Sequence, residues 1–140
     1  MAIAQAMCTS FKEDLFQKEQ DLDSDQIYIA LYTSSASLDA DTLAYTATNE
    51  VANGNGYTTT GVRLTTPVIG TSGTTAYVDF DNPEWTSASF TTAGALIYND
   101  TLAGKNAIAV LNFGGDFTVT AGTFRIVFPA PGAAGLIRID

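Results

Sequence analysis

The sequence predicts a mostly β fold, an antiparallel β-sandwich of jelly-roll-like or Ig-like type with one N-terminal α-helix. Short apolar runs recur along the chain with Gly, Pro, Asn and Asp between them, which is typical of strands joined by turns. Only the first residues show helical periodicity. A chain of 140 residues has the size of one domain. We therefore expect residues 1–140 to form a single unit, with a helix within 1–22 and a sandwich over 26–140 that contains a long loop at 34–57.

Residues 2–20 carry the one convincing helical pattern. On a helical wheel the apolar side chains fall within an arc of about 100°, the width of a stripe that faces a core. The helix should end near Gln20, because the three acids of the next segment, 21–25, would be unfavourable at the negative end of a helix. Phe16 lies about 130° from the centre of the stripe, so we expect it to face solvent. The stripe consists of Ala4, Met7, Cys8, Phe11 and Leu15.

The segment QIYIALYT, residues 26–33, is apolar at odd and at even positions. A strand with two apolar faces is buried on both sides, so we expect a central strand here. Near the C-terminus, Phe124, Ile126 and Phe128 should point inward and Arg125 outward. Further strands are predicted at 57–66, 74–81, 93–98, 106–113, 116–120, 123–128 and 135–139. Turns are predicted between them, among others at 70–73, 114–115 and 121–122.

The balance of charge argues against two classes of partner. The formal net charge is −9 and the isoelectric point is near 4.1, and the six basic residues are scattered. Such a chain is repelled by phosphate, so we expect neither nucleic acid nor an anionic membrane surface as a partner. The first residues lack the basic and apolar regions of a signal peptide, and no run approaches the ~20 apolar residues of a membrane span. We expect a protein made in a cytoplasm.

The residue types predict no catalytic, cofactor-binding or metal-ligating residue, and hence no enzyme. The absence of histidine removes the Ser-His and Cys-His nucleophile pairs and the usual zinc ligand sets. The single cysteine, Cys8, lies on the apolar stripe and is expected to be a small buried thiol. No phosphate-binding or dinucleotide motif is present.

Carboxylates are the remaining candidates for catalysis. Asp79 and Asp81 share one face of a predicted strand, with Glu84 just beyond, and two acids at such a spacing can flank a glycosidic bond. However, Val78 and Phe80 form a clean inward face. We therefore expect Asp79 and Asp81 to be the solvent-facing partners of that face.

The acidic segment 21–25 has the Asp-x-Asp-x-Asp opening of a calcium-binding loop. The sixth position of such a loop needs glycine and is Gln26, and the twelfth needs glutamate and is Tyr32. The sequence therefore argues against an EF-hand. The sequon Asn99-Asp100-Thr101 is expected by chance in a chain rich in Asn and Thr.

The stretch WTSASFTTAGALIYND, residues 85–100, carries no donor or acid–base cluster suited to a reaction. Pro83 should fix the approach to the stretch, and Gly94 should allow a tight bend before the apolar run enters the sheet. Trp85 and Phe90 are expected to cap the edge of the sandwich. We interpret the stretch as architecture.

Seven segments spread over the whole chain carry a family resemblance. They are AIAQAMCTSFK at the start, IALYTSSASL (29–38), ATNEVANGNGYTTTG (47–61), GTTAYVDFDNPEW (73–85), ASFTTAGALIYND (88–100), AIAVLNFGGD (107–116) and the GTF…FP…IRI ending. In these segments the chain resembles short structural proteins of tailed bacteriophages. The resemblance implies a virion protein, by preference a capsid decoration (cement) protein that binds the head lattice as a homo-oligomer, with the major capsid protein as partner. A neck, tail or fibre accessory protein is the alternative, and no site residue of the family maps onto this chain.

Two further expectations concern surface aromatic residues. A function of another class, a carbohydrate- or receptor-binding β-sandwich, would use Trp85 and the aromatic-rich strands as a stacking platform. If the chain assembles instead, Phe16 is expected to fill a pocket on an adjacent subunit or on the capsid protein.

Overall fold

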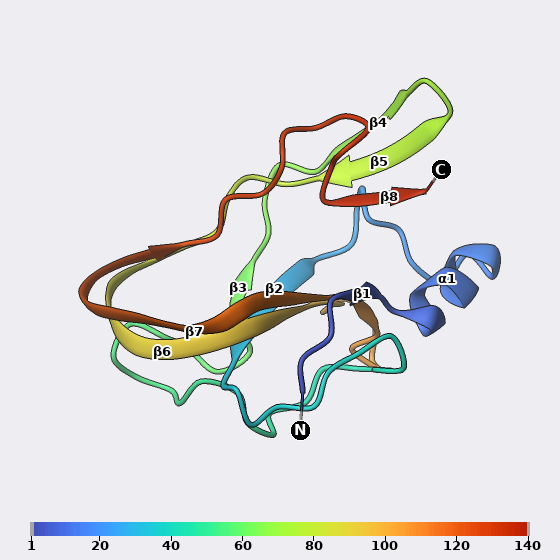
Figure 1. Ribbon diagram of the computed structural model, residues 1–140. Coiled ribbons are helices and arrows are strands. Elements are labelled where there is room, and N and C mark those ends of the chain that lie inside the picture. The colour runs from blue at the N-terminus through green and yellow to red at the C-terminus, as the bar shows by residue number, and fades with distance from the viewer. Residues whose placement is uncertain (1, 140) are drawn as a thin grey trace.

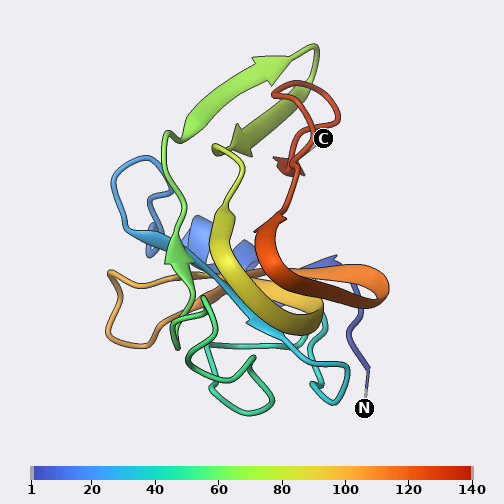
Figure 2. The ribbon, with the colours of Figure 1, turned by 90° about the vertical axis from the view of Figure 1, so that its left-hand side faces the viewer.

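Two antiparallel sheets and one short helix make up residues 2–139, the part of the chain that the computed structural model describes (Figure 1). The five-stranded sheet has the order β1-β7-β6-β2-β3, and the three-stranded sheet, in the order β4-β5-β8, lies over one of its faces (Figures 1 and 2). The predicted fold class, mostly β and antiparallel with one helix, is confirmed. In chain order the elements are β1 (Ala6–Met7), α1 (Thr9–Phe16), β2 (Ile27–Tyr32), β3 (Val62–Arg63), β4 (Val68–Ser72), β5 (Thr75–Asp79), β6 (Glu84–Asn99), β7 (Ala107–Arg125) and β8 (Ile137–Ile139).

Helix α1 is much shorter than the predicted helix over 2–20. The residues before it bind other parts of the chain instead: Ala4 donates its backbone N–H to Leu38, and β1 pairs with β7. After α1 the chain leaves the helical conformation at Lys18, whose φ is 59°. No helix among residues 2–139 is long and apolar enough to cross a membrane.

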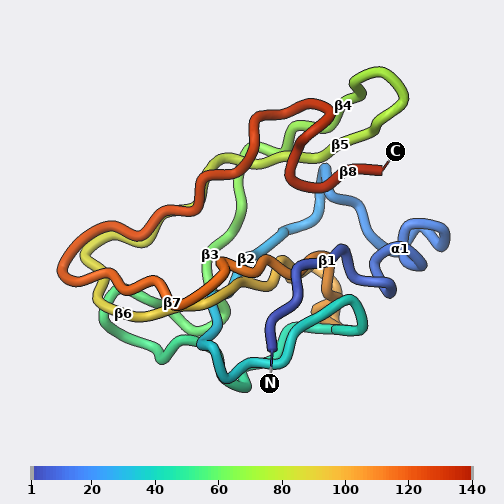
Figure 3. Tube along the Cα trace, in the orientation of Figure 1, coloured from blue at the N-terminus to red at the C-terminus, as the bar shows by residue number. Residues whose placement is uncertain are grey.

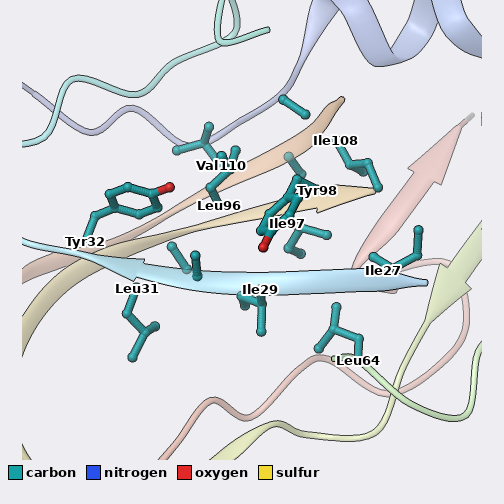
Figure 4. Close-up of a cluster of buried hydrophobic side chains, with 14 of the residues drawn as sticks. Ile27, Ile29, Leu31, Tyr32, Leu64, Leu96, Ile97, Tyr98, Ile108 and Val110 are labelled. Carbon is teal, nitrogen blue, oxygen red and sulfur yellow. The ribbon is translucent and has the colours of Figure 1, made fainter. Parts of the chain in front are cut away.

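Strand β2 is the interior strand that the sequence predicts. It pairs with β6 on one side and with β3 on the other, and every residue in it is buried except the half-buried Tyr28. Figure 4 shows Leu31 with Leu64 on one side of the strand and Tyr32 on the other. The two apolar faces of the sequence are therefore both used in the core.

Strands β6 and β7 form one long hairpin that bends from the large sheet towards the small one (Figure 2). β6 begins at Glu84 rather than near residue 93, and β7 replaces three predicted strands. The Gly-Gly pair at 114–115 and the Ala-Gly pair at 121–122 lie within β7 at irregularities of the ladder rather than at turns. Residues 113–116 stand opposite Ala93 alone, so they bulge out of the ribbon, and such bulges let a strand bend.

The small sheet consists of the β4–β5 hairpin and the C-terminal strand. β4 occupies residues that the sequence assigned to the turn at 70–73, and the turn itself lies at residues 73–74. β5 and β8 lie within the predicted strands at 74–81 and 135–139. The short β3 keeps little of the strand predicted at 57–66.

The reason for the short β3 lies in the two residues before it. Thr60 and Gly61 have φ values of 86° and 85°, which interrupt an extended strand. Before them, the predicted long loop at 34–57 contains no strand and only isolated bridges, such as Ala44↔Asn106. The loop lies along the face of the five-stranded sheet opposite to the small sheet (Figure 1).

Candidate functional site

An apolar cavity of about 510 Å³ lies between helix α1 and the three-stranded sheet. On the sheet side, Ile69, Val78 and Ile137 are direct cross-strand partners, so their side chains share one face. On the other side, α1 contributes Phe11 and Leu15. Two elements far apart in the sequence therefore build the cavity, and Figure 1 shows α1 and the end of β8 at the same end of the molecule.

The rim of this cavity carries both signs of charge. Lys18, Glu19, Asp21 and Asp25 come from the segment that follows α1, and Arg138 comes from β8. The Arg138 guanidinium donates a hydrogen bond of 2.9 Å to the carbonyl of residue 135, which holds the side chain beside the sheet. Two cations against three acids give the rim a charge of −1, out of −9 for the whole chain.

Phe16 lies at the end of α1, directly after Leu15. Its side chain is 93% exposed, whereas Phe11 on the same helix is buried. The prediction that Phe16 faces solvent while Phe11 belongs to the core is confirmed. The exposed ring thus stands on the same helix that forms one wall of the apolar cavity.

A second exposed apolar surface lies on β7 and the residues after it. The ring of Phe113 packs against two others, with centroid distances of 6.1 Å to Phe117 and 6.0 Å to Phe124. Phe117 is 50% exposed and Val127 is 71% exposed, and both border a hollow of about 230 Å³. Beyond Asn112, whose backbone N–H donates to the Gln5 side chain, β7 pairs only with β6 among the described residues, so the outer edge of this part is free. The sequence predicted this region as separate strands and so gave no sign of a continuous edge.

Trp85 and Phe90 lie inside this ribbon rather than at an exposed edge. Trp85 is 3% exposed, and its ring packs 5.8 Å from that of Phe124. Phe90 stands edge-on to Phe124 and to Tyr57. The reading of this stretch as architecture agrees with the packing. Gly94, however, provides close approach rather than a bend, because a Cβ there would lie 2.8 Å from the side chain of Ile3.

The predicted solvent-facing carboxylates are only partly found. Asp79 is 2% exposed, so the prediction for this residue is wrong. The regular alternation ends with β5 at Asp79, and both Asp79 and Phe80 are buried. One oxygen of Asp79 accepts the Phe80 N–H at 2.8 Å, while Oδ2 has no hydrogen-bond partner in the described structure. Burial therefore raises the pKa of the Asp79 carboxyl.

The other two acids of this group are engaged at the surface. Asp81 is exposed, as predicted, and accepts a hydrogen bond of 2.8 Å from Thr66. Glu84 lies 3.6 Å from Arg125 across the β6–β7 ladder. Asp79 and Asp81 border one hollow of about 250 Å³, but Asp79 is buried and Asp81 accepts the hydrogen bond from Thr66. This arrangement is not the matched, exposed pair that a glycosidase needs.

The acidic segment 21–25 is held by donors of the chain itself. Asp21 accepts hydrogen bonds from the backbone N–H groups of Asp23 and Ser24, and Asp25 accepts one from the Asn99 amide at 2.7 Å. Asn99 is buried, so a glycan could not be attached to it in the folded chain. No group of three His, Cys, Asp or Glu side chains that could hold a metal ion is found within residues 2–139.

Cys8 is a buried thiol, as predicted. Burial, together with the nearby Asp39 carboxylate, raises its pKa to about 11, and Lys12 lowers it only in part. A thiol with such a pKa stays protonated near neutral pH, so Cys8 is unreactive in the folded chain.

A carboxylate that the sequence analysis did not single out holds the long loop to the sheet. Glu50 accepts hydrogen bonds from the phenols of Tyr45 and Tyr57 and from the backbone N–H of Thr60, at 2.6 Å for Tyr45 and 2.8 Å for Thr60. Tyr45 also stacks on Tyr98 of β6, with ring centroids 4.8 Å apart. The cluster fastens the loop and offers no free acid or base. The signal in the sequence was faint: Tyr45 and Tyr57 are the only aromatic residues of the 34–57 segment.

No known protein family, no curated protein and no solved structure matches this chain.

Proposed function

We propose that the chain is a structural protein of a tailed-bacteriophage particle. In this proposal it is a capsid decoration protein that binds the head lattice as a homo-oligomer and contacts the major capsid protein. The observation that carries the proposal is the outer side of β7, where a free strand edge and exposed apolar side chains lie together. The resemblance of the sequence to short phage structural proteins supplies the kind of particle.

The free edge of β7 is suited to binding another chain. An uncovered strand edge presents unpaired N–H and C=O groups, which readily pair with a strand of another molecule. Phe117 and Val127 expose apolar area next to that edge, and exposed apolar patches mark interaction surfaces. This edge therefore supplies both the backbone pairing and the apolar contact that a protein partner needs.

The remaining features agree with a role on the outside of a particle. A lattice presents many equivalent sites, so modest affinity at each one is enough for stable attachment of an oligomer. The net charge of −9 disfavours contact with packaged DNA. The buried polar groups around Glu50 and Asn99 are used to hold the fold.

Co-sedimentation with isolated heads and isolated tails of the phage that encodes the chain tests the proposal. We expect saturable binding to heads, and we expect Phe117→Asp to weaken it at least about tenfold, as is usual for a changed interface anchor. Leu43→Asp is the matched control, because it also replaces an exposed apolar side chain by aspartate, but in the 34–57 loop. Binding to tails alone would favour the neck or tail accessory protein, and binding to neither would refute the proposal.

A glycan array separates this proposal from a carbohydrate-binding module. Trp85 is buried, so it cannot serve as an open stacking platform for a sugar ring. We expect no specific sugar signal, and a reproducible one would contradict the structural role.

A further inference from the structure

We infer that a second copy of this chain covers the apolar cavity beside α1, and that each copy inserts its Phe16 ring into the cavity of the other. The inference rests on the proposed homo-oligomer and deepens it, because it names the residues that join two copies. The contact between the two copies would lie at the α1 end of the molecule, and the β7 edge would stay available to bind the capsid.

The Phe16 ring and the wall of the cavity are both apolar and exposed. Phe16 is 93% exposed, more than any other large apolar side chain that the structure describes, and Ile69 and Ile139 of the cavity wall are each about half exposed, at 53% and 52%. Burying a phenylalanine ring removes ~150–250 Å² from water. The cavity of about 510 Å³ has the size of pockets that hold small ligands, so one ring fits in it.

The position of the ring suits exchange between two equal copies. In a twofold dimer the same patch meets itself, so the inserting group and the receiving cavity must both lie on that patch. Leu15 lines the cavity and Phe16 is the next residue of the same helix, about 100° further round. The ring therefore stands beside the mouth of its own cavity and cannot fill it. Two α1 helices that pack antiparallel would place each ring over the partner's cavity.

The charges of the rim favour a second copy at this place. Two molecules of charge −9 repel each other over most of their surfaces. The rim of the cavity is nearly neutral, and it contains Lys18 and Arg138, two of the six basic residues of the chain. A twofold rotation can bring these cations opposite Glu19 and Asp21 of the other copy, so the patch is complementary to itself.

Sedimentation velocity on four proteins tests the inference. We expect the wild type to form dimers and Phe16→Ala to lose about 10³-fold in dimer affinity, because each dimer loses two interface anchors and one anchor usually contributes about 30-fold. Ala76→Trp should also dissociate the dimer, because Ala76 lines the cavity and a large ring there would occupy it. Leu43→Ala, at an exposed leucine outside the cavity, should dimerise like the wild type. The melting temperature of the Phe16→Ala monomer should stay that of the wild-type monomer, since an exposed ring adds little to folding.

Cross-linking locates the contact. Phe16→Cys in one chain and Ala76→Cys in another, both with Cys8→Ser, should be joined by a short bis-maleimide when the two proteins are mixed. Leu43→Cys in place of Phe16→Cys should give no such product.

The outcomes separate this inference from the proposed function. A dimer that survives both Phe16→Ala and Ala76→Trp overturns the inference and leaves an oligomer intact. A strictly monomeric wild type, or a small apolar molecule found bound in the cavity by native mass spectrometry, also overturns it. If the dimer depends on Phe16 but the wild type binds neither heads nor tails, the inference stands and the proposed function fails.

Discussion

Replacing Glu50 with glutamine is expected to loosen the 34–57 loop from the five-stranded sheet. The carboxylate accepts hydrogen bonds from Tyr45, Tyr57 and the backbone N–H of Thr60. A glutamine has one oxygen, and its NH2 group cannot accept a hydrogen bond from a phenol or from an N–H group. At least one of the three donors therefore loses its partner, and the others face a neutral acceptor.

The size of the effect follows from these contacts. A hydrogen bond to a charged group contributes about 1.5–3 kcal/mol, and an unsatisfied buried donor costs about 1–3 kcal/mol. We therefore expect the free energy of unfolding of Glu50→Gln to fall by about 2–4 kcal/mol. For a chain of this size, 1 kcal/mol corresponds to about 3–4 °C, so the melting temperature should drop by about 6–16 °C.

Thermal unfolding followed by circular dichroism measures this change, and limited proteolysis shows where it acts. Glu13→Gln is the matched control, because it removes the same charge from an exposed residue of α1. We expect proteases to cut Glu50→Gln first within the 34–57 loop and to leave the control intact. If Glu50→Gln melts at the same temperature as Glu13→Gln, the carboxylate does not hold the loop and the reasoning is refuted.

Three further outcomes follow from burial and backbone geometry. Burial and the bond to Glu50 raise the pKa of Tyr57 above its ordinary value near 10, so stability should be complete below pH ~10 and fall as the pH rises further. Tyrosinate absorbance should then appear together with unfolding, and a gradual titration of the folded chain would contradict this. Burial raises the pKa of Asp79, so the wild type should lose stability as the pH rises above the ordinary aspartate pKa of ~4. Asp79→Asn should therefore become more stable relative to the wild type as the pH rises above ~4, and a stability difference independent of pH would count against this. Gly61→Ala should cost ~2–5 kcal/mol in denaturant unfolding, because its Cβ would meet the Ile29 carbonyl at a positive φ. Gly73→Ala is the control, because Gly73 also has a positive φ but has open space where the Cβ would lie. It should cost only the free energy of holding an alanine at a positive φ. Equal losses of stability in the two variants would show that the contact with the Ile29 carbonyl is unimportant.

The sequence predicted correctly those elements whose burial follows from their own residues. β2 could be predicted because a central strand needs two apolar faces, and residues 26–33 have both. The helix was predicted too long because residues 2–7 look helical in isolation, whereas the structure pairs them with Leu38 and with β7. Asp79 was placed outside because alternation was extended past the end of β5. These two predictions failed because the structure of the residues depends on pairing with a distant segment or on where a strand ends.

The candidate site likewise has one part that the local sequence predicts and one part that it does not. Exposure of Phe16 could be predicted because Phe11, Leu15 and Phe16 all lie within the part of the helix that forms. The cavity beside them could not, because its other wall comes from β4, β5 and β8, which only the topology brings there. Likewise, the acceptor of the Tyr45 phenol lies nearby in sequence, but its stacking partner Tyr98 is on β6.

The separation of the two sheets has a mechanical consequence. No strand pairing joins them within residues 2–139, and they are connected by the segments 64–67, 80–83 and 126–136. These segments are hydrogen-bonded to one another, as from Asp81 to Thr65 and from Ile126 to Pro83, and Figure 3 shows the start of the 126–136 segment far from α1. What holds the two sheets face to face, apart from these segments, is side-chain packing: Ile137 of the small sheet and Ile29 of the large one belong to the same buried core. A group that fills the cavity therefore acts on the packing between the sheets and leaves the hydrogen bonds of both ladders unchanged.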